Sequence, residues 1–150
     1  MNAQSLFSFL LVGMFPLAVA TCFVLLFVTA PYGRHARKGW GVTVGNRLAW
    51  VLMEIPAFVV IAGLVLSSPA RDSAVALVPL AFWMFHYGYR TFVFPALMRP
   101  SDKTFPAVLV LFAIAFNVLN GFNNAQPLIE SASQGSTVLS AHFILGTVIF

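Results

Sequence analysis

The feature that most constrains this chain is a run of 25 residues, from Leu6 to Ala30, that contains no charged side chain. As an α-helix rising about 1.5 Å per residue, the run would be about 37 Å long, and the hydrocarbon core of a bilayer is about 30 Å thick. Backbone N–H and C=O groups in lipid must find partners within their own segment, which favours a helix. The run therefore predicts a transmembrane helix.

The same pattern recurs along the chain, with short polar or basic stretches between apolar segments. Composition agrees, because 60% of the 150 residues are hydrophobic and 8% are charged. A soluble domain is about a quarter charged, and that polar surface keeps it in solution. We predict an all-α, polytopic integral membrane helix bundle forming a single domain, with spans at about 6–30, 48–66, 74–98 and 104–128 and the start of a fifth at 138–150.

The last apolar segment, residues 138–150, is too short for a full span. As a helix it would reach only about 20 Å before the chain stops. We interpret the sequence as the amino-terminal part of a longer protein whose carboxy-terminal helices are missing here. A short re-entrant or interfacial end is the alternative.

The positive charges predict the orientation in the membrane. The stretch after the first span holds four Lys/Arg and the stretch after the third holds two, against one after the second and none after the fourth. Because cytoplasmic loops carry the excess of Lys and Arg, we expect an outside or lumenal amino terminus. The membrane is a bacterial inner membrane or that of the endoplasmic reticulum. The cations do not form a stripe with interleaved aromatic residues, so a nucleic acid partner is not expected.

Three kinds of site are not expected. With Cys22 as the one cysteine, neither an intrachain disulfide nor a cysteine metal site can form. His142 has no second histidine or carboxylate at ligand spacing, so no metal site is predicted. The glycines of GWGVTVG do not match GxGxxG and no strand is predicted before them, which excludes a Rossmann domain.

Ionisable side chains inside the predicted spans are the candidates for function, because a charge in lipid is costly and needs a partner. Counted from the nearest basic loop residue, Glu54 lies about 10 Å, Arg90 about 13 Å and Tyr87 about 18 Å into the membrane, all in the cytoplasmic half. Glu54 and Arg90 could simply lock two helices together as an ion pair. Alternatively, a carboxyl in a dry pocket can stay protonated and, with the phenol, donate hydrogen bonds to one carbonyl oxygen and stabilise an enolate.

Other polar residues in the spans give weaker signals. His86 adjoins Tyr87 and could relay a proton, although a lone histidine in a helix is more typical of an interhelical hydrogen bond. Asn117, Asn120 and Asn124 recur at intervals of three and four residues and line one helix face. That face could point at a cavity or bond a neighbouring helix.

Three stretches together resemble the steroid 5α-reductase family, in order and in spacing, over roughly residues 31–124. They are PYGRHARKGWG, then RLAWVLMEIPAF, and then HYGYRTFVFPALMRP running through KTFPAVLVLFAIAFNVLNGF. The resemblance implies a seven-helix membrane oxidoreductase that transfers hydride from NADPH to the β-carbon of an α,β-unsaturated ketone. In that family the ketone is typically a 3-oxo-Δ4-steroid.

The resemblance also implies roles for individual residues. In the family, the Glu of the W-x-x-x-E-x-P motif and the Tyr of the H-Y-x-x-R-T motif hold the substrate's carbonyl oxygen, and they fall on Glu54 and Tyr87. Both are therefore the candidate catalytic and substrate-binding residues. Trp50, one turn before the glutamate, becomes a candidate wall of the substrate cavity, and Arg90 resembles the motif arginine that supports the site. Asn120 is a further substrate-binding candidate.

Members of the family carry most of their NADPH contacts in carboxy-terminal helices and loops, so the cofactor-binding residues are expected mostly beyond Phe150. Two alternatives stay open for the function. Because sister families share the architecture, the substrate could be another lipid enone or an enoyl thioester. From a different class, a small transporter or a structural membrane subunit could use Glu54 and Arg90 for ion passage or assembly.

Overall fold

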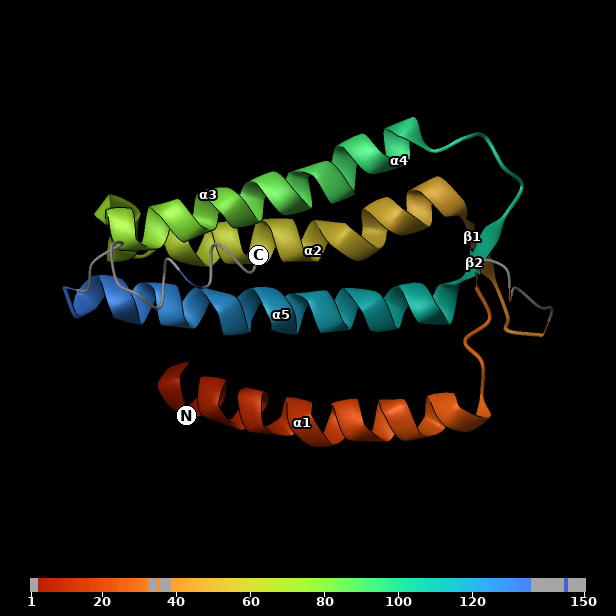
Figure 1. Cartoon of the computed structure of the whole chain (residues 1–150), viewed down its shortest axis with the longest axis horizontal. Helices are drawn as coiled ribbons and strands as arrows, with labels where there is room; N and C mark the ends of the chain where they lie inside the picture. The colour runs from red at the N-terminus through yellow and green to blue at the C-terminus, as the bar shows by residue number, and fades with distance from the viewer. Residues whose placement is uncertain (1–2, 33–34, 36–38, 136–144, 146–150) are drawn as a thin grey trace.

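The computed structural model describes residues 3–32, 35, 39–135 and 145. Four helical rods lie side by side with their long axes roughly aligned (Figure 1). Three are single helices, α1 (Ala3–Phe27), α2 (Asn46–Leu66) and α5 (Ala107–Ser133). The fourth rod joins α3 (Ala74–Gly88), the π-helical turn η3 (Tyr89–Val93) and α4 (Phe94–Leu97). The short 3₁₀ helix η2 (Pro69–Asp72) connects α2 to α3, between the spans predicted at 48–66 and 74–98.

Three of the described helices are long and apolar enough to cross a membrane, Ser5–Phe27, Asn46–Leu66 and Ala107–Ser133. The prediction of a helical membrane protein is confirmed in part, by these three helices. The segment predicted as a span at 74–98 is divided by η3, so its α3 portion has only 15 residues. Its rod nevertheless runs beside α2 (Figure 1), and its crossing of the membrane stays a prediction.

Several sequence-based expectations fall on residues that the structure does not describe. They are His142, the loop cations Arg34, Arg37 and Lys38, and the fifth apolar segment at 138–150, of which the structure describes only Leu145. The seven-helix count and the truncated fifth span therefore stay predictions.

The predicted bounds of the first and fourth spans differ from the helices. The helix α1 ends at Phe27 instead of Ala30. Pro31 disfavours helical conformation at Ala30, the residue directly before it. The helix α5 begins at Ala107 instead of Thr104. It also continues to Ser133, beyond the predicted end of the span at about 128.

A two-stranded antiparallel ribbon, which the sequence did not predict, explains the late start of α5. Strand β1 (Thr43–Gly45) pairs with β2 (Thr104–Pro106). The helix α2 follows β1 directly and α5 follows β2 directly, so both helices start from the ribbon and run in the same direction (Figure 1). Two backbone hydrogen bonds extend the pairing, from Asn46 N–H to the Lys103 carbonyl at 3.1 Å and from Ala107 N–H to the Val42 carbonyl at 2.8 Å.

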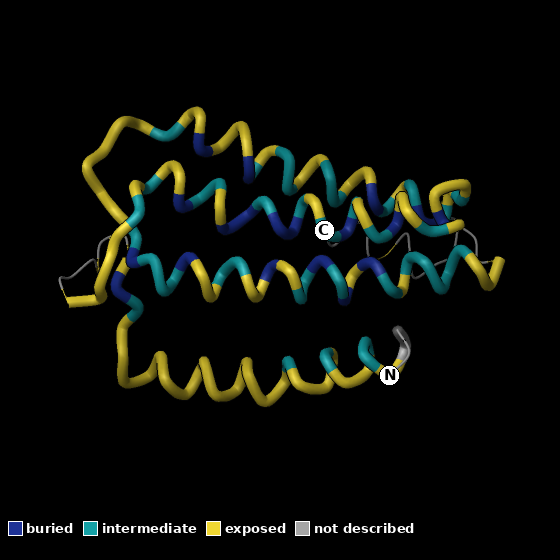
Figure 2. Tube along the Cα trace, turned by 180° about the vertical axis from the view of Figure 1, so that it is seen from behind, coloured by how far each residue is buried: buried dark blue, intermediate teal, exposed yellow. Residues whose placement is uncertain are grey.

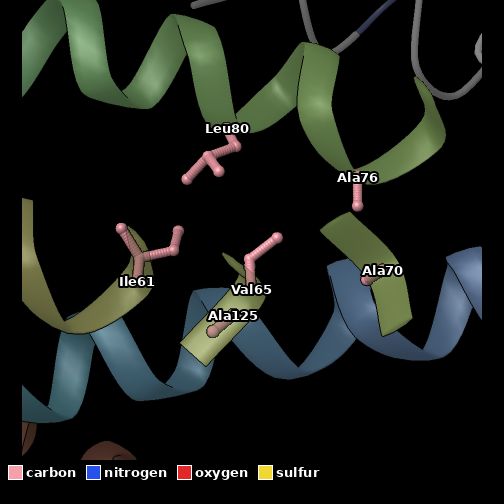
Figure 3. Close-up of a cluster of buried hydrophobic side chains, with 6 residues drawn as sticks. All are labelled: Ile61, Val65, Ala70, Ala76, Leu80 and Ala125. Carbon is pink, nitrogen blue, oxygen red and sulfur yellow. The ribbon is translucent and has the colours of Figure 1, made fainter. Parts of the chain in front are cut away.

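The core lies between α2, the α3 rod and α5. Figure 3 shows its larger cluster, which comprises Ile61, Val65, Ala70, Ala76, Leu80 and Ala125. A second cluster, nearer the ribbon, comprises Ala49, Met53 and Val110. By contrast, α1 is exposed along most of its length (Figure 2), as expected for an apolar helix that lipid would surround. The three central elements therefore position the polar residues.

Gly121 allows α2 and α5 to approach closely. A Cβ atom added there would lie 3.0 Å from the Val60 Cβ and 3.4 Å from the Ile61 nitrogen. We expect Gly121→Ala to push the helices apart and to lower the free energy of unfolding by about 1–3 kcal/mol, as overpacking usually does. The control is Gly63→Ala in α2, where an added Cβ meets nothing within 4 Å. Thermal unfolding in detergent compares the two variants, and equal midpoints would contradict the prediction.

Candidate active site

The buried carboxyl of Glu54 on α2 is paired with Arg90 from the neighbouring rod. An Arg90 Nη2 N–H donates to the Glu54 Oε1. The Glu54 side chain is 7% exposed and that of Arg90 is 42% exposed. The Arg90 guanidinium also lies 5.5 Å from the centre of the Trp50 ring, within the range of a cation–π contact. The structure therefore brings the side chains of Glu54, Arg90 and Trp50 together.

The segment that carries Arg90 is irregular. Tyr89–Val93 form a π-helical turn, and such turns occur frequently at functional sites. Thr91 within the turn is fully buried, and its hydroxyl oxygen has no hydrogen-bond partner among the described residues. Trp50 packs edge-on against Phe94 in the α4 segment, with ring centres 5.2 Å apart. The turn thus lies against α2 at the level where Arg90 meets Glu54.

Tyr87 is held by aromatic packing and by one hydrogen bond. Its ring stacks on Trp83, with ring centres 4.7 Å apart and planes inclined by 26°. The Trp83 indole N–H in turn donates to the Ala57 carbonyl on α2 at 2.9 Å. Asn120 on α5 donates from Nδ2 to the Tyr87 hydroxyl oxygen at 3.1 Å. Tyr87 also lies three residues before Arg90 on the same rod, the spacing at which helix side chains are neighbours.

The Tyr87 hydroxyl proton has no acceptor within the described part of the chain, since in its hydrogen bond with Asn120 the phenol oxygen accepts. A phenol can accept and donate at once, so the bond from Asn120 leaves its proton available for another group. The candidate site therefore combines a free phenolic donor with a neighbouring buried ion pair.

The asparagine face of α5 serves two purposes. Asn117 donates from Nδ2 to the Met53 carbonyl at 2.6 Å, which is the helix-bonding role that the sequence left open. Asn120 instead reaches Tyr87, and Asn124 bonds to Asn120. His86 is exposed, and its ring contacts that of Tyr87 edge-on at 5.2 Å.

Sequence reasoning missed Trp83, which places Tyr87. Its position four residues before Tyr87 is the spacing at which helix side chains meet, so the signal was present. It also missed the bond from Arg47 Nη2 to the Met98 carbonyl, which ties the start of α2 to the end of α4.

A hollow of about 470 Å³ lies at the ribbon end of the molecule and includes neither Glu54 nor Tyr87. Its lining residues are Gly45, Asn46, Arg47, Leu48, Arg99, Pro100, Ser101 and Asp102. Two arginines against the one carboxylate of Asp102 give this hollow a net positive charge, which suits an anion.

Fold and site together define a helical protein of the membrane type, with an ion pair and a hydrogen-bonded phenol between its central helices. No model of a protein family matches the chain. Among curated proteins, it is 36% identical over 126 residues to the Steroid 5-alpha-reductase DET2 of Gossypium hirsutum, covering 82% of this chain and 49% of that protein. The DET2 protein of Arabidopsis thaliana is 31% identical over 137 residues, which are 87% of this chain and 52% of the relative.

A mammalian relative shows similar agreement. The 3-oxo-5-alpha-steroid 4-dehydrogenase 2 of Rattus norvegicus is 37% identical over 117 residues, which cover 76% of this chain and 45% of that protein. The chain is therefore homologous to the steroid 5-alpha-reductases over most of its length, and the family resemblance predicted from the motifs is confirmed. It spans about half the length of the curated relatives it matches.

Proposed function

We propose that the protein is a membrane-embedded, NADPH-dependent reductase of the C=C bond of an α,β-unsaturated ketone, converting a 3-oxo-Δ4-steroid to a 5α-steroid. The names of the relatives support the substrate class. The observation that carries the chemistry is the Tyr87 phenol, which accepts a hydrogen bond from Asn120 and keeps its own proton beside the Glu54–Arg90 pair.

The phenol acts on the ketone oxygen of the substrate. Hydride addition at the β-carbon shifts the C=C electron pair, so negative charge develops on that oxygen, and a proton then adds at the α-carbon. A hydrogen bond from the Tyr87 hydroxyl strengthens as the charge grows. Since only interactions that are stronger in the transition state accelerate the reaction, this bond lowers the barrier.

Glu54 contributes the second hydrogen bond to the same oxygen. An Arg90 N–H binds one oxygen of the Glu54 carboxyl, and the other oxygen carries the proton that is donated to the ketone. In this proposal, Arg90 orients the carboxyl and the ketone enters at its other oxygen. Trp50 forms a wall beside the arginine.

NADPH, when bound, supplies the hydride. The residues around the ribbon-end hollow fit its phosphates in chemical type, because Arg47 and Arg99 offer guanidinium N–H groups and Ser101 a hydroxyl. In the predicted orientation this end faces the cytoplasm. We expect the remaining cofactor contacts from residues beyond Phe150.

The test of the function is an assay of membranes from cells that express the complete protein. We expect NADPH consumption to match the formation of 5α-reduced product from a 3-oxo-Δ4-steroid, measured by chromatography and mass spectrometry. A panel that includes another lipid enone and an enoyl thioester separates the related substrates. Absence of NADPH binding would favour the transporter or structural alternative.

Substitution of Glu54 tests its role as a donor. Glu54→Gln keeps an N–H donor at the same place, so we expect kcat to fall by less than about tenfold. Glu54→Ala removes the donor, so we expect kcat to fall by about 10²-fold. The control for the first variant is Glu130→Gln in the last turns of α5, expected to be neutral. Equal losses in the glutamine and alanine variants would show that charge, and not donation, is what Glu54 provides.

A further inference from the structure

A chain of hydrogen bonds along α5 ends at the candidate catalytic phenol. The Asn124 Nδ2 donates to the Asn120 backbone carbonyl at 2.9 Å and lies 3.0 Å from the Asn120 Oδ1. The Asn120 Nδ2 then donates to the Tyr87 hydroxyl oxygen at 3.1 Å. Asn124 is exposed and Asn120 half-buried, so the chain runs inward from the helix surface.

The geometry determines which way each amide faces. A backbone carbonyl can only accept, so the Asn124 atom beside it must be the NH₂ group. An NH₂ group can only donate, so the Asn120 atom that it meets must be the carbonyl oxygen. The other end of the Asn120 amide, its NH₂, is therefore the end that faces Tyr87.

The direction of this chain decides what the phenol can do. With an NH₂ group facing it, the Tyr87 oxygen accepts, and its proton is left for a ligand. If Asn120 were turned over, its Oδ1 would face the phenol and would accept that proton instead. Accepting a bond also polarises the O–H group, since hydrogen bonds in a chain strengthen one another.

We propose that Asn124 is a positioning residue that holds the Asn120 amide in one orientation and thereby keeps the Tyr87 proton available to the substrate's carbonyl oxygen. This inference rests on the proposed function and deepens it. Asn120 then acts through Tyr87, in place of the direct substrate contact that the sequence predicted for it.

The decisive variant is Asn124→Asp. Its carboxylate cannot donate to Asn120; it accepts from the Asn120 NH₂ group and turns the amide over. We expect kcat to fall by about 10²-fold, close to the loss of an oxyanion donor, with KM changed less than about threefold. Asn124→Ala removes the restraint on the Asn120 amide without turning the amide over, so its loss of kcat should be intermediate.

The control is Gln126→Glu on α5, which makes the same change from amide to carboxylate two residues away.

A second readout needs no turnover. Ultraviolet resonance Raman spectra distinguish a tyrosine hydroxyl that accepts from one that donates, and subtracting the Tyr87→Phe spectrum isolates this phenol. We expect an accepting phenol in the wild-type protein and a donating one in Asn124→Asp. An unchanged tyrosine signature in Asn124→Asp, or equal losses of kcat in Asn124→Asp and Gln126→Glu, would overturn the proposal. A protein that reduces no enone but shows the spectral change would refute the proposed function and leave the amide orientation supported.

Discussion

Tyr87→Phe is expected to lower kcat for an enone by about 10²–10³-fold, the usual effect of removing one donor from a developing oxyanion. The substitution deletes only the hydroxyl, so the ring should still stack on Trp83 and the helices should still pack. The measurement is the steady-state rate of 5α-product formation by the complete protein in membranes. KM should change little, because the lost bond is strongest in the transition state.

Tyr89→Phe provides the matched control, since Tyr89 lies two residues further along and is 49% exposed. It makes the same chemical change outside the ion-pair and phenol cluster, and we expect wild-type rates. Turnover that is unchanged in Tyr87→Phe and also in Glu54→Gln and Glu54→Ala would end the assignment of these two residues to catalysis.

Arg90→Met is expected to have the largest effect on stability. It leaves the buried Glu54 carboxylate without its counter-ion, and breaking a buried pair in this way costs about 3–5 kcal/mol. Because the Arg90 side chain is 42% exposed, we expect a loss near the lower end, about 3 kcal/mol. Thermal and denaturant-induced unfolding in detergent micelles measure it.

The double variant Glu54→Gln/Arg90→Met separates the ion pair from the rest of the arginine's contacts. Removing both charges should recover most of the stability, since the remaining amide no longer buries an unpaired charge. The part of the stability that the double variant does not recover measures the packing of Arg90 over Trp50. Strictly additive effects of the two single substitutions would mean that the pair does not couple α2 to the neighbouring rod.

The membrane-type helices were predictable because their signal is local. An apolar run in lipid must satisfy its backbone polar groups within itself, so Leu6–Ala30 and Leu48–Leu66 indicated α1 and α2 before any contact was known. The break between the spans predicted at 48–66 and 74–98 also has a local signal, in the proline and charges of Pro69, Arg71 and Asp72.

The principal pairing in the candidate site was also accessible from the sequence. Distances from the basic loops placed Glu54 and Arg90 in the same half of the membrane, and a buried carboxylate needs a cation nearby. Both residues also lie in the motifs of the steroid 5-alpha-reductase resemblance. Their ion pair in the structure agrees with both arguments, whereas their roles in catalysis stay proposals.

The sequence by itself therefore determined the helical membrane class, the resemblance to the steroid 5-alpha-reductases and the polar partners between the second and third apolar segments, because apolar length, motif and charge cost are properties of the chain. Only the tertiary structure decided the β1–β2 ribbon, the π-helical turn at Tyr89–Val93 and the direction of the Asn120 amide. The strands are three residues long, too short for a periodic signal, and they pair segments far apart in the chain. The turn carries Arg90 to Glu54 on α2, and the Asn120 amide lies between Asn124 on its own helix and Tyr87 on the neighbouring rod. No local pattern encodes such contacts between helices.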